Sequence, residues 1–338
     1  MRLVGLLVFC SSPIIFVACT EAPPSTSSTS QSVTGHNRLA ANRLAANRLA
    51  ANRLAANRLA ANQLELNQND SGDLLATADG RDVLSYVVSC AVPSTESLVA
   101  NTQQSCAVDT DCQPDPTLPF AGVCSSNKCT YTFPVGIGLA PHWLNHELDD
   151  DGKGWISACL FSRVNAHDTS EEISLRGPNN ALTVAPDEAA LYDVEEGAFY
   201  GNLFTPEDQP IDWIACEGEG QASGEFGGLV DRDCTEPDPA NPGFTQCGFI
   251  YAGFCGDYTP AVPNPQACDE FSSNGYYEDC HATASLLTHH GHDHEHGDRG
   301  HDGDDDHHSD DGDDHGHDGC HHQGNITYQQ VITTFVTD

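Results

Sequence analysis

Cysteine content constrains this chain more than any other feature of its sequence. There are 15 cysteines in 338 residues, and none of them forms a Cys-X-X-Cys pair of the kind that holds structural zinc. Cysteine at this density is typical of an exported protein that folds in an oxidising compartment. We therefore expect disulfides, with a structural zinc cluster as the disfavoured alternative, to cross-link the folded part of the chain.

The first residues predict export. Residues 1–18 combine Arg2 with an apolar stretch too short to span a membrane, which is the pattern of a signal peptide. The stretch ends in Phe16-Val17-Ala18-Cys19, which resembles the lipobox of bacterial lipoproteins, although Phe16 stands where Leu is usual. This predicts lipidation at Cys19 and a surface or outer-membrane protein anchored to the membrane through its lipid. Ordinary signal-peptidase cleavage and secretion are the alternative.

Two low-complexity segments follow the leader. Residues 19–36 are rich in Ser, Thr and Pro, which predicts a solvated tether. Residues 37–68 form a neck with five NRLAA repeats, and a Leu at every fifth position produces no apolar stripe on a helix and alternates faces on a strand. We expect a partly helical spacer, with one coil of a pentapeptide-type β-solenoid as the alternative.

We expect one disulfide-stapled α+β domain at residues 70–288, with a small mixed sheet and two main helices, and a C-terminal element at 325–338 that joins it. Apolar residues at helical spacing place the helices at 79–91 and about 150–166. Extended runs bounded by turn residues predict strands at 172–176, 181–184, 190–194, 198–203, 212–216 and 248–251. We expect residues 327–337 to return to the domain as a helix or strand.

An even set of twelve cysteines is expected to form disulfides, once Cys10 in the leader, the lipid-bearing Cys19 and the isolated Cys320 are set aside. The pairing stays open, although residues 106–129 are expected to form a small stapled insertion between the two helices. The twelve are Cys90, Cys106, Cys112, Cys124, Cys129, Cys159, Cys216, Cys234, Cys247, Cys255, Cys268 and Cys280.

The arrangement resembles uncharacterised secreted proteins and lipoproteins of myxobacteria, which carry short Asn/Leu repeats before a Cys-rich domain. The resemblance lies in four short runs: GRDVLSYVVSC at 80–90, WISACL at 155–160, ISLRG at 173–177 and EGAFYGN at 196–202. It covers about residues 74–280 and implies a surface location without implying an activity.

Residues 289–322, which we call the His-rich segment, hold 12 of the 17 histidines together with 12 acidic residues and contain no large apolar side chain. Such a sequence has nothing to bury. Imidazole and thiolate ligands suit Zn²⁺, Ni²⁺ and Cu²⁺, so we expect a metal-binding tail at 289–324, with a solvated spacer as the alternative. Its candidate ligands are His289, His290, His292, His294, His296, His301, His307, His308, His315, His317, Cys320, His321 and His322.

Charge and motifs limit the possible functions. A net charge of −37 excludes an electrostatic nucleic-acid binder. We identify no catalytic residue: His146-Glu147 lacks the second His of a zinc peptidase, and the acidic pairs Glu171-Glu172 and Glu195-Glu196 are unremarkable at this acid density. The leading expectation is a metal-binding surface protein. A recognition or adhesion module with a protein or glycan partner is the alternative, and a secreted hydrolase is the third.

Overall fold

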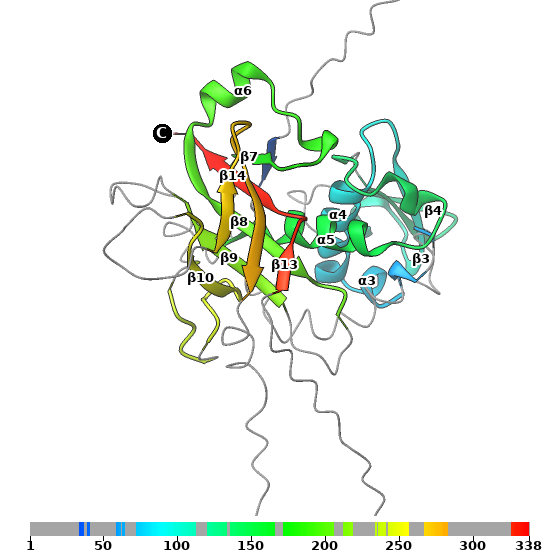
Figure 1. Cartoon of the computed structure of the whole chain (residues 1–338). Helices are drawn as coiled ribbons and strands as arrows, with labels where there is room; N and C mark the ends of the chain where they lie inside the picture. The colour runs from blue at the N-terminus through cyan, green and yellow to red at the C-terminus, as the bar shows by residue number, and fades with distance from the viewer. Residues whose placement is uncertain are drawn as a thin grey trace, which may run out of the picture. The chain divides into compact units, whose positions relative to one another are not determined.

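A six-stranded sheet forms the centre of the fold in the computed structural model, and the last strand of the chain lies inside it (Figure 1). Neighbouring strands are antiparallel except for the last pair, which is parallel. In spatial order the strands are β1 (Thr34–His36), β7 (Glu172–Arg176), β14 (Ile332–Val336), β8 (Val194–Asn202), β9 (Asp212–Glu217) and β10 (Ile250–Phe254). The structure describes residues 34–36, 39–40, 59–61, 63–64, 72–112, 120–133, 136–165, 172–205, 212–218, 234, 236–240, 243–256, 267–282 and 326–337.

Both predicted helices are confirmed. The first, α4 (Ala78–Ala91), begins after Thr77, whose hydroxyl accepts a hydrogen bond from the Gly80 backbone N–H. The second, α5 (Asp150–Phe161), is capped in the same way by Asp149 and ends five positions before the predicted boundary. An N-cap oxygen satisfies backbone donors that the helix leaves unpaired, which explains the acidic run at 149–151. The helix α5 packs on β8 and against α4.

Three smaller sheets and several short helices complete the described elements. The sheets are β3-β5-β4 (Leu98–Ser105, Lys128–Phe133, Ala121–Ser125), β11-β12-β13 (Cys268–Phe271, Tyr277–Ala282, Ile326–Tyr328) and β2-β6 (Leu39–Ala40, Val164–Asn165). The short helices are α3 (Gly72–Ala76), α6 (Pro186–Leu191) and the 3₁₀ turns η1 (Asp109–Asp111), η2 (Pro141–Leu144) and η3 (Asn180–Leu182).

Two of the predicted strands are wrong. Residues 181 and 182 lie in the 3₁₀ turn η3, which begins where the Asn179 side chain accepts from the Ala181 N–H, and residues 183 and 184 belong to no strand. Residues 190–194 straddle the end of α6 and the start of β8. Pro186 at the first turn of α6 favours a helix start, and this signal outweighs the short apolar run that follows. The strands β7, β8, β9 and β10 lie close to their predicted positions.

Short parts of the predicted tether and neck contribute to the folded body. Residues 34–36, assigned to the tether by sequence, form the edge strand β1 against β7. At the end of the neck, Leu59 and Leu64 are buried in the hydrophobic core. The Leu64 N–H donates to the Trp143 carbonyl at 2.7 Å, and the Ala60 carbonyl accepts from Leu148 at 2.8 Å. Leu59, Ala60 and Leu64 therefore pack on the folded body.

All twelve cysteines expected to form disulfides do so. With the helices and mixed sheets described above, this confirms the disulfide-rich α+β class. Cys90–Cys159 joins α4 to α5, and the predicted insertion is stapled by two bonds within itself. The six disulfides are Cys90–Cys159, Cys106–Cys124, Cys112–Cys129, Cys216–Cys255, Cys234–Cys247 and Cys268–Cys280.

Three arginines are buried, and each lies over an aromatic ring. The guanidinium of Arg81 lies 4.7 Å from the Tyr131 centroid, that of Arg163 lies 5.9 Å from the Tyr86 centroid, and that of Arg176 covers Phe335 at 3.5 Å. Burial lowers the pKa of Arg163 to about 10. Because these cations are used in the interior, they leave the surface acidic.

Candidate functional site

The His-rich segment itself lies outside the described residues, but the strands on either side of it are described. β12 ends at Ala282 and β13 begins at Ile326, and these two residues are direct partners in an antiparallel pair. Cys280 pairs with Tyr328 and His281 with Thr327 in the same register. The segment that we expected to be a tail is thus an insertion, and it leaves and rejoins the sheet at the same end of the paired strands β12 and β13.

His281 lies where this insertion leaves the sheet. Its Nε2 is 2.7 Å from Asp269 Oδ1 on β11, and its Nδ1 is 3.1 Å from Thr327 Oγ1 on β13. Both ring nitrogens therefore have hydrogen-bond partners in the sheet, and neither is left for a metal ion in this arrangement. Sequence reasoning missed His281 because it precedes the dense His-rich segment. Its position directly after Cys280 is the signal that could have identified it.

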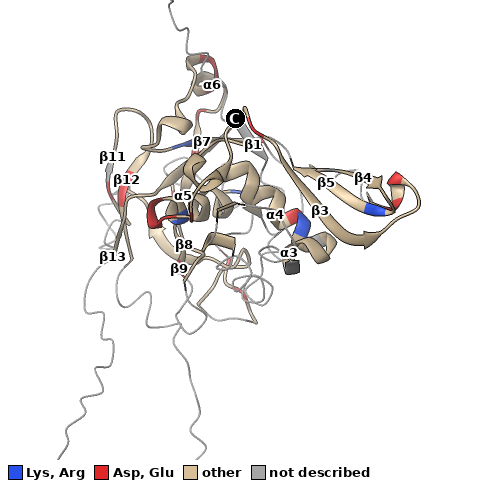
Figure 2. Cartoon of the chain, turned by 90° about the vertical axis from the view of Figure 1, so that its right-hand side faces the viewer, with Lys and Arg blue, Asp and Glu red and all other residues tan. Residues whose placement is uncertain are grey.

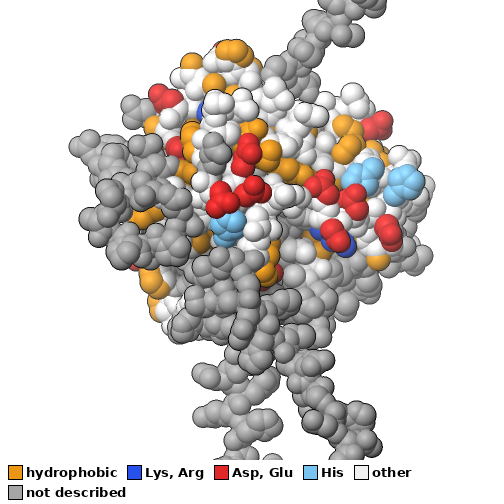
Figure 3. Space-filling model, viewed as in Figure 1, with side chains coloured by type: hydrophobic (Ala, Val, Ile, Leu, Met, Phe, Trp, Pro, Cys, Tyr) orange, Lys and Arg blue, Asp and Glu red, His pale blue; other side chains and the backbone are white. Residues whose placement is uncertain are grey.

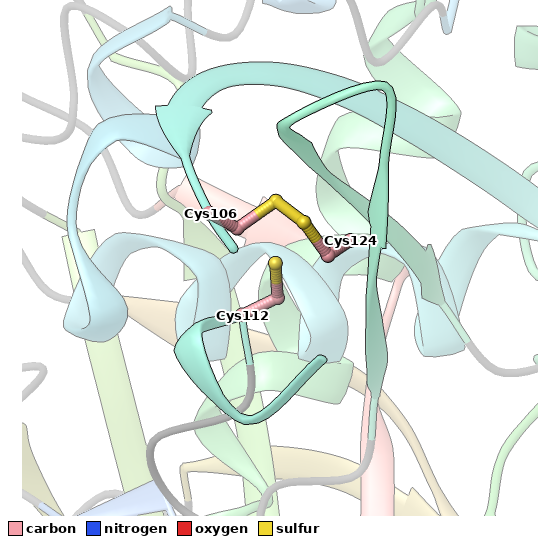
Figure 4. Close-up of side chains that lie close together, drawn as sticks. All are labelled: Cys106, Cys112 and Cys124. Carbon is pink, nitrogen blue, oxygen red and sulfur yellow. A yellow bond between two sulfur atoms is a disulfide. The ribbon is translucent and has the colours of Figure 1, made fainter. Parts of the chain in front are cut away.

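Cysteine sulfurs gather in two groups within the described part of the chain. The Sγ atoms of Cys106, Cys112 and Cys124 lie within 4.8 Å of one another, and Figure 4 shows the bond between Cys106 and Cys124 beside Cys112. In the second group, the Sγ atoms of Cys216 and Cys268 are 3.7 Å apart. Every one of these sulfurs belongs to a disulfide. A metal ion needs thiolates, so in this oxidised state neither group offers them.

The surface of the described body is acidic. Figure 2 shows few Lys and Arg residues along the ribbon, and Figure 3 shows acidic side chains gathered over β11 and β12. Among the described residues the cationic side chains are Arg81, Lys128, Lys153, Arg163 and Arg176, and the three arginines are buried. Lys153 is 2.9 Å from Asp150. This surface therefore attracts cations and repels anions.

Two adjacent pockets open beside this acidic surface. The larger, of about 520 Å³, lies between α5, residues 178–180, β12 and the link between β13 and β14. The smaller, of about 410 Å³, shares residues 178–180 and continues toward Asn274 and Tyr276. Sequence reasoning named none of their lining residues as site residues, because four separate chain segments bring them together.

The other acidic and histidine motifs have structural partners. Glu195 accepts a hydrogen bond from Tyr277 at 2.7 Å, and Glu196 accepts one from Thr334 at 2.6 Å, so both carboxylates are held inside the sheet. His142 Nε2 lies 3.0 Å from Asp149 Oδ1, the oxygen that also caps α5. These contacts favour structural roles for Glu195, Glu196 and His142.

Comparison of the chain with protein-family models, curated proteins and solved structures finds no match. Cys19, the predicted lipidation site, lies outside the described residues. In the described part of the chain, no helix is both long and apolar enough to cross a membrane.

Proposed function

We propose that this protein captures divalent transition-metal ions, Zn²⁺, Ni²⁺ or Cu²⁺, through the His-rich segment. The proposal rests on the donor set: twelve imidazoles, twelve carboxylates and the thiol of Cys320 occur within residues 289–322. Imidazole nitrogen and thiolate sulfur prefer these ions, whereas carboxylates alone favour Ca²⁺ and Mg²⁺. A segment that combines imidazoles, carboxylates and a thiol therefore favours Zn²⁺, Ni²⁺ and Cu²⁺ over Ca²⁺ and Mg²⁺.

The pairing of Ala282 with Ile326 is the structural observation that supports this proposal. A free tail carries its ligands on a chain fixed at one end. Here both ends are held by strands, and β12 is joined to β11 by the Cys268–Cys280 disulfide. Fixing both ends reduces the conformational entropy that the segment loses when several side chains converge on one ion. A closed loop should therefore bind a shared ion better than an open tail of the same composition.

The acidic body contributes to the same activity. The formal net charge is −37, and only Lys128 and Lys153 supply cationic groups outside the interior in the described part of the chain. A negative field raises the local concentration of divalent cations within about 10 Å of the surface at 0.1 M salt.

We propose that the activity is located outside the cytoplasm. Six disulfides favour an oxidising compartment, and the lipobox-like run before Cys19 favours a lipid anchor at the outer membrane or cell surface. A released, secreted form is the alternative. In either location the His-rich segment can meet environmental metal directly.

A variant with Gln at all twelve His positions of residues 289–322 tests the proposal. This substitution keeps every carboxylate, so the electrostatic attraction for cations is unchanged while the imidazoles are lost. We expect Zn²⁺ and Ni²⁺ affinity in equilibrium dialysis at pH 7 to fall at least about a hundredfold. Ca²⁺ binding, which depends on oxygen ligands, serves as the control and should not change. Equal Zn²⁺ affinity in both proteins would refute a His-based site.

A further inference from the structure

Four cysteines lie together beside the turn that joins β4 to β5, and we call them the four-cysteine cluster: Cys106, Cys112, Cys124 and Cys129. The Sγ atoms of the first three lie within 4.8 Å of one another (Figure 4). Cys129 is bonded to Cys112 and is the direct cross-strand partner of Cys124, so its side chain lies on the same face of the sheet. In a tetrahedral Zn²⁺ site with bonds of about 2.3 Å, the sulfurs are about 3.8 Å apart. The sulfurs of the cluster are therefore already close to the spacing that one ion requires.

The sequence spacing of the cluster is compatible with a zinc site, although it contains no Cys-X-X-Cys pair. Four residues separate Cys124 from Cys129, and zinc ligand pairs have about two to four residues between them. The chain reverses at Ser126 and Asn127, which both have positive φ, so the two cysteines face each other across the strands. The loop at 106–112 supplies the other two cysteines, which five residues separate. A hairpin and a short loop thus present the sulfurs as two pairs.

Hydrogen bonds hold these two segments together independently of the disulfides. The Asp111 carboxylate accepts from the N–H groups of Ala107 at 2.8 Å and Val108 at 3.2 Å. The Asp109 carboxylate accepts from the Cys124 N–H at 2.8 Å. These bonds join the loop to itself and to β4, and they do not depend on a sulfur–sulfur bond. The four thiols of the reduced protein should therefore stay close together.

Solvent reaches this cluster more readily than the other disulfides. Cys124 is partly exposed and Cys106 is 9% exposed, whereas the other ten paired cysteines are at most 1% exposed. A dissolved dithiol attacks a disulfide only where it can reach a sulfur atom. The Cys106–Cys124 bond is therefore the one that a dithiol should break first.

The first reduction makes the neighbouring disulfide reactive. A dithiol donates two electrons to the Cys106–Cys124 bond, becomes a disulfide itself and leaves two cysteine thiols. The Cys112 sulfur lies within reach of both, so the Cys106 thiolate can attack it, form a Cys106–Cys112 bond and release the Cys129 thiolate. A second dithiol reduces the new bond. Two dithiols are oxidised in total, and four cysteine thiols result.

We propose that the four-cysteine cluster is a redox-dependent binding site for one divalent transition-metal ion of the Zn²⁺ type. In the oxidised protein its sulfurs are bonded in pairs and offer no thiolate. After reduction, four thiols release four protons and bind the ion as thiolates. Two equivalents of a disulfide oxidant reverse the process: they take up the four electrons, both disulfides form again and the ion leaves. The site is separate from the His-rich segment, and it exists before the disulfides form, because a newly made chain has its cysteines as thiols.

Titration of the reduced protein with Co²⁺, a spectroscopic substitute for Zn²⁺, tests this proposal. The protein is the full chain with Gln at the twelve His positions of residues 289–322 and Cys320→Ser, so that segment offers neither imidazole nor thiolate. Dithiothreitol reduces it in the absence of oxygen and is then removed by gel filtration. We expect one Co²⁺ to bind per chain, with the intense thiolate-to-cobalt absorption of a tetrahedral sulfur site. The oxidised protein should show no such absorption.

Two double variants in this protein locate the site. Cys106→Ser/Cys124→Ser removes the accessible disulfide and two of the four ligands. We expect it to bind Co²⁺ at least about a hundredfold more weakly after reduction, because two thiolates alone do not complete the site. The control Cys234→Ser/Cys247→Ser removes a disulfide outside the cluster that closes a similarly short loop, and it should bind like the parent protein.

Timed alkylation with peptide mass mapping gives a second readout that needs no substitution in the body. The cluster should be reduced before the other four disulfides, and Zn²⁺ should slow its alkylation at least about tenfold. Cys216 and Cys268, whose sulfurs are 3.7 Å apart but buried, are the internal comparison. The proposal would be overturned by reduced protein without thiolate-to-cobalt absorption, by equal Co²⁺ binding in the two double variants, or by a cluster that stays oxidised while the buried disulfides are reduced. Zn²⁺ protection of Cys216 and Cys268 in place of the cluster would overturn it as well.

Discussion

Ala282 and Ile326 are direct partners across two antiparallel strands, although the whole His-rich segment lies between them in the chain. The strand that follows, β14, lies between β7 and β8 in the six-stranded sheet. The chain therefore completes its core only after the His-rich segment has been made. That segment is an insertion into the fold, and changes within it should leave the body intact.

Metal release should follow the protonation of imidazole. A histidine with an ordinary pKa of about 6.5 is neutral at pH 7 and charged at pH 5, and only the neutral ring ligates. We expect bound Zn²⁺ to be lost as pH falls from about 7 to 5.5. Zinc retained by the protein after dialysis at stepped pH values measures this. Stoichiometric retention at pH 5 would point to a site without histidine.

The disulfide between the two main helices should stabilise the fold more than a disulfide that closes a short loop does. Cys90 and Cys159 are 69 residues apart and Cys234 and Cys247 are 13 apart. The loop-entropy model assigns about 4 kcal/mol to the first bond and about 3 kcal/mol to the second. Replacing each pair by Ala and measuring unfolding in guanidinium checks the order. A larger loss from the Cys234–Cys247 pair would contradict it.

Asp149, which caps α5, should contribute more to the free energy of unfolding than the neighbouring Asp150 does. Asp149 accepts from the Gly152 N–H at 2.8 Å, whereas Asp150 is exposed and bonds only Lys153. Asp149→Ala should lower the free energy of unfolding by about 1 kcal/mol. Asp150→Ala is the matched control and should cost less than about 0.5 kcal/mol. Equal effects in urea denaturation would show that the cap is not stabilising.

Several tyrosines should resist ionisation until the fold is lost. Burial raises the pKa of Tyr192 to about 12, and it also raises the pKa of Tyr200, Tyr251 and Tyr328. Because folding favours the neutral phenol, these groups contribute stability below pH about 10 that is lost as the pH rises further. Absorbance at 295 nm during alkaline titration should show a delayed group that titrates together with loss of circular dichroism. Titration of all nine tyrosines near pH 10 with the fold intact would contradict this.

The sequence predicted the helices correctly, because spacing and capping residues within each segment determine them. Helices α4 and α5 follow from apolar spacing together with the caps Thr77 and Asp149. The sheet β3-β5-β4 was not predicted, because the polar run of β3 is held by distant partners such as Thr130 and Thr132 on β5. The hairpin of β4 and β5 turns at Ser126 and Asn127, both with positive φ, and only Asn127 signals such a turn.

The candidate sites likewise differ in whether their residues are consecutive in the chain or come together only in the fold. The His-rich segment is visible in the sequence because its ligands are consecutive. The 520 Å³ pocket is not, because its lining residues Asp151, Asn180, Glu278 and Gln329 come from four separate segments of the chain. Burial of Leu59 and Leu64 was likewise hidden, since a period of five fits neither a helix stripe nor a strand face.

The most direct test replaces residues 289–322 by a short Gly-Ser linker and compares the metal content of the two purified proteins at pH 7. The strands β12 and β13 are already adjacent, so the shortened loop should close them, and shortening changes the closure free energy by only about 1 kcal/mol. We predict a folded protein with the same six disulfides and almost no bound Zn²⁺ or Ni²⁺, while the full chain binds at least one ion. A shortened protein that still carries stoichiometric metal would contradict the account.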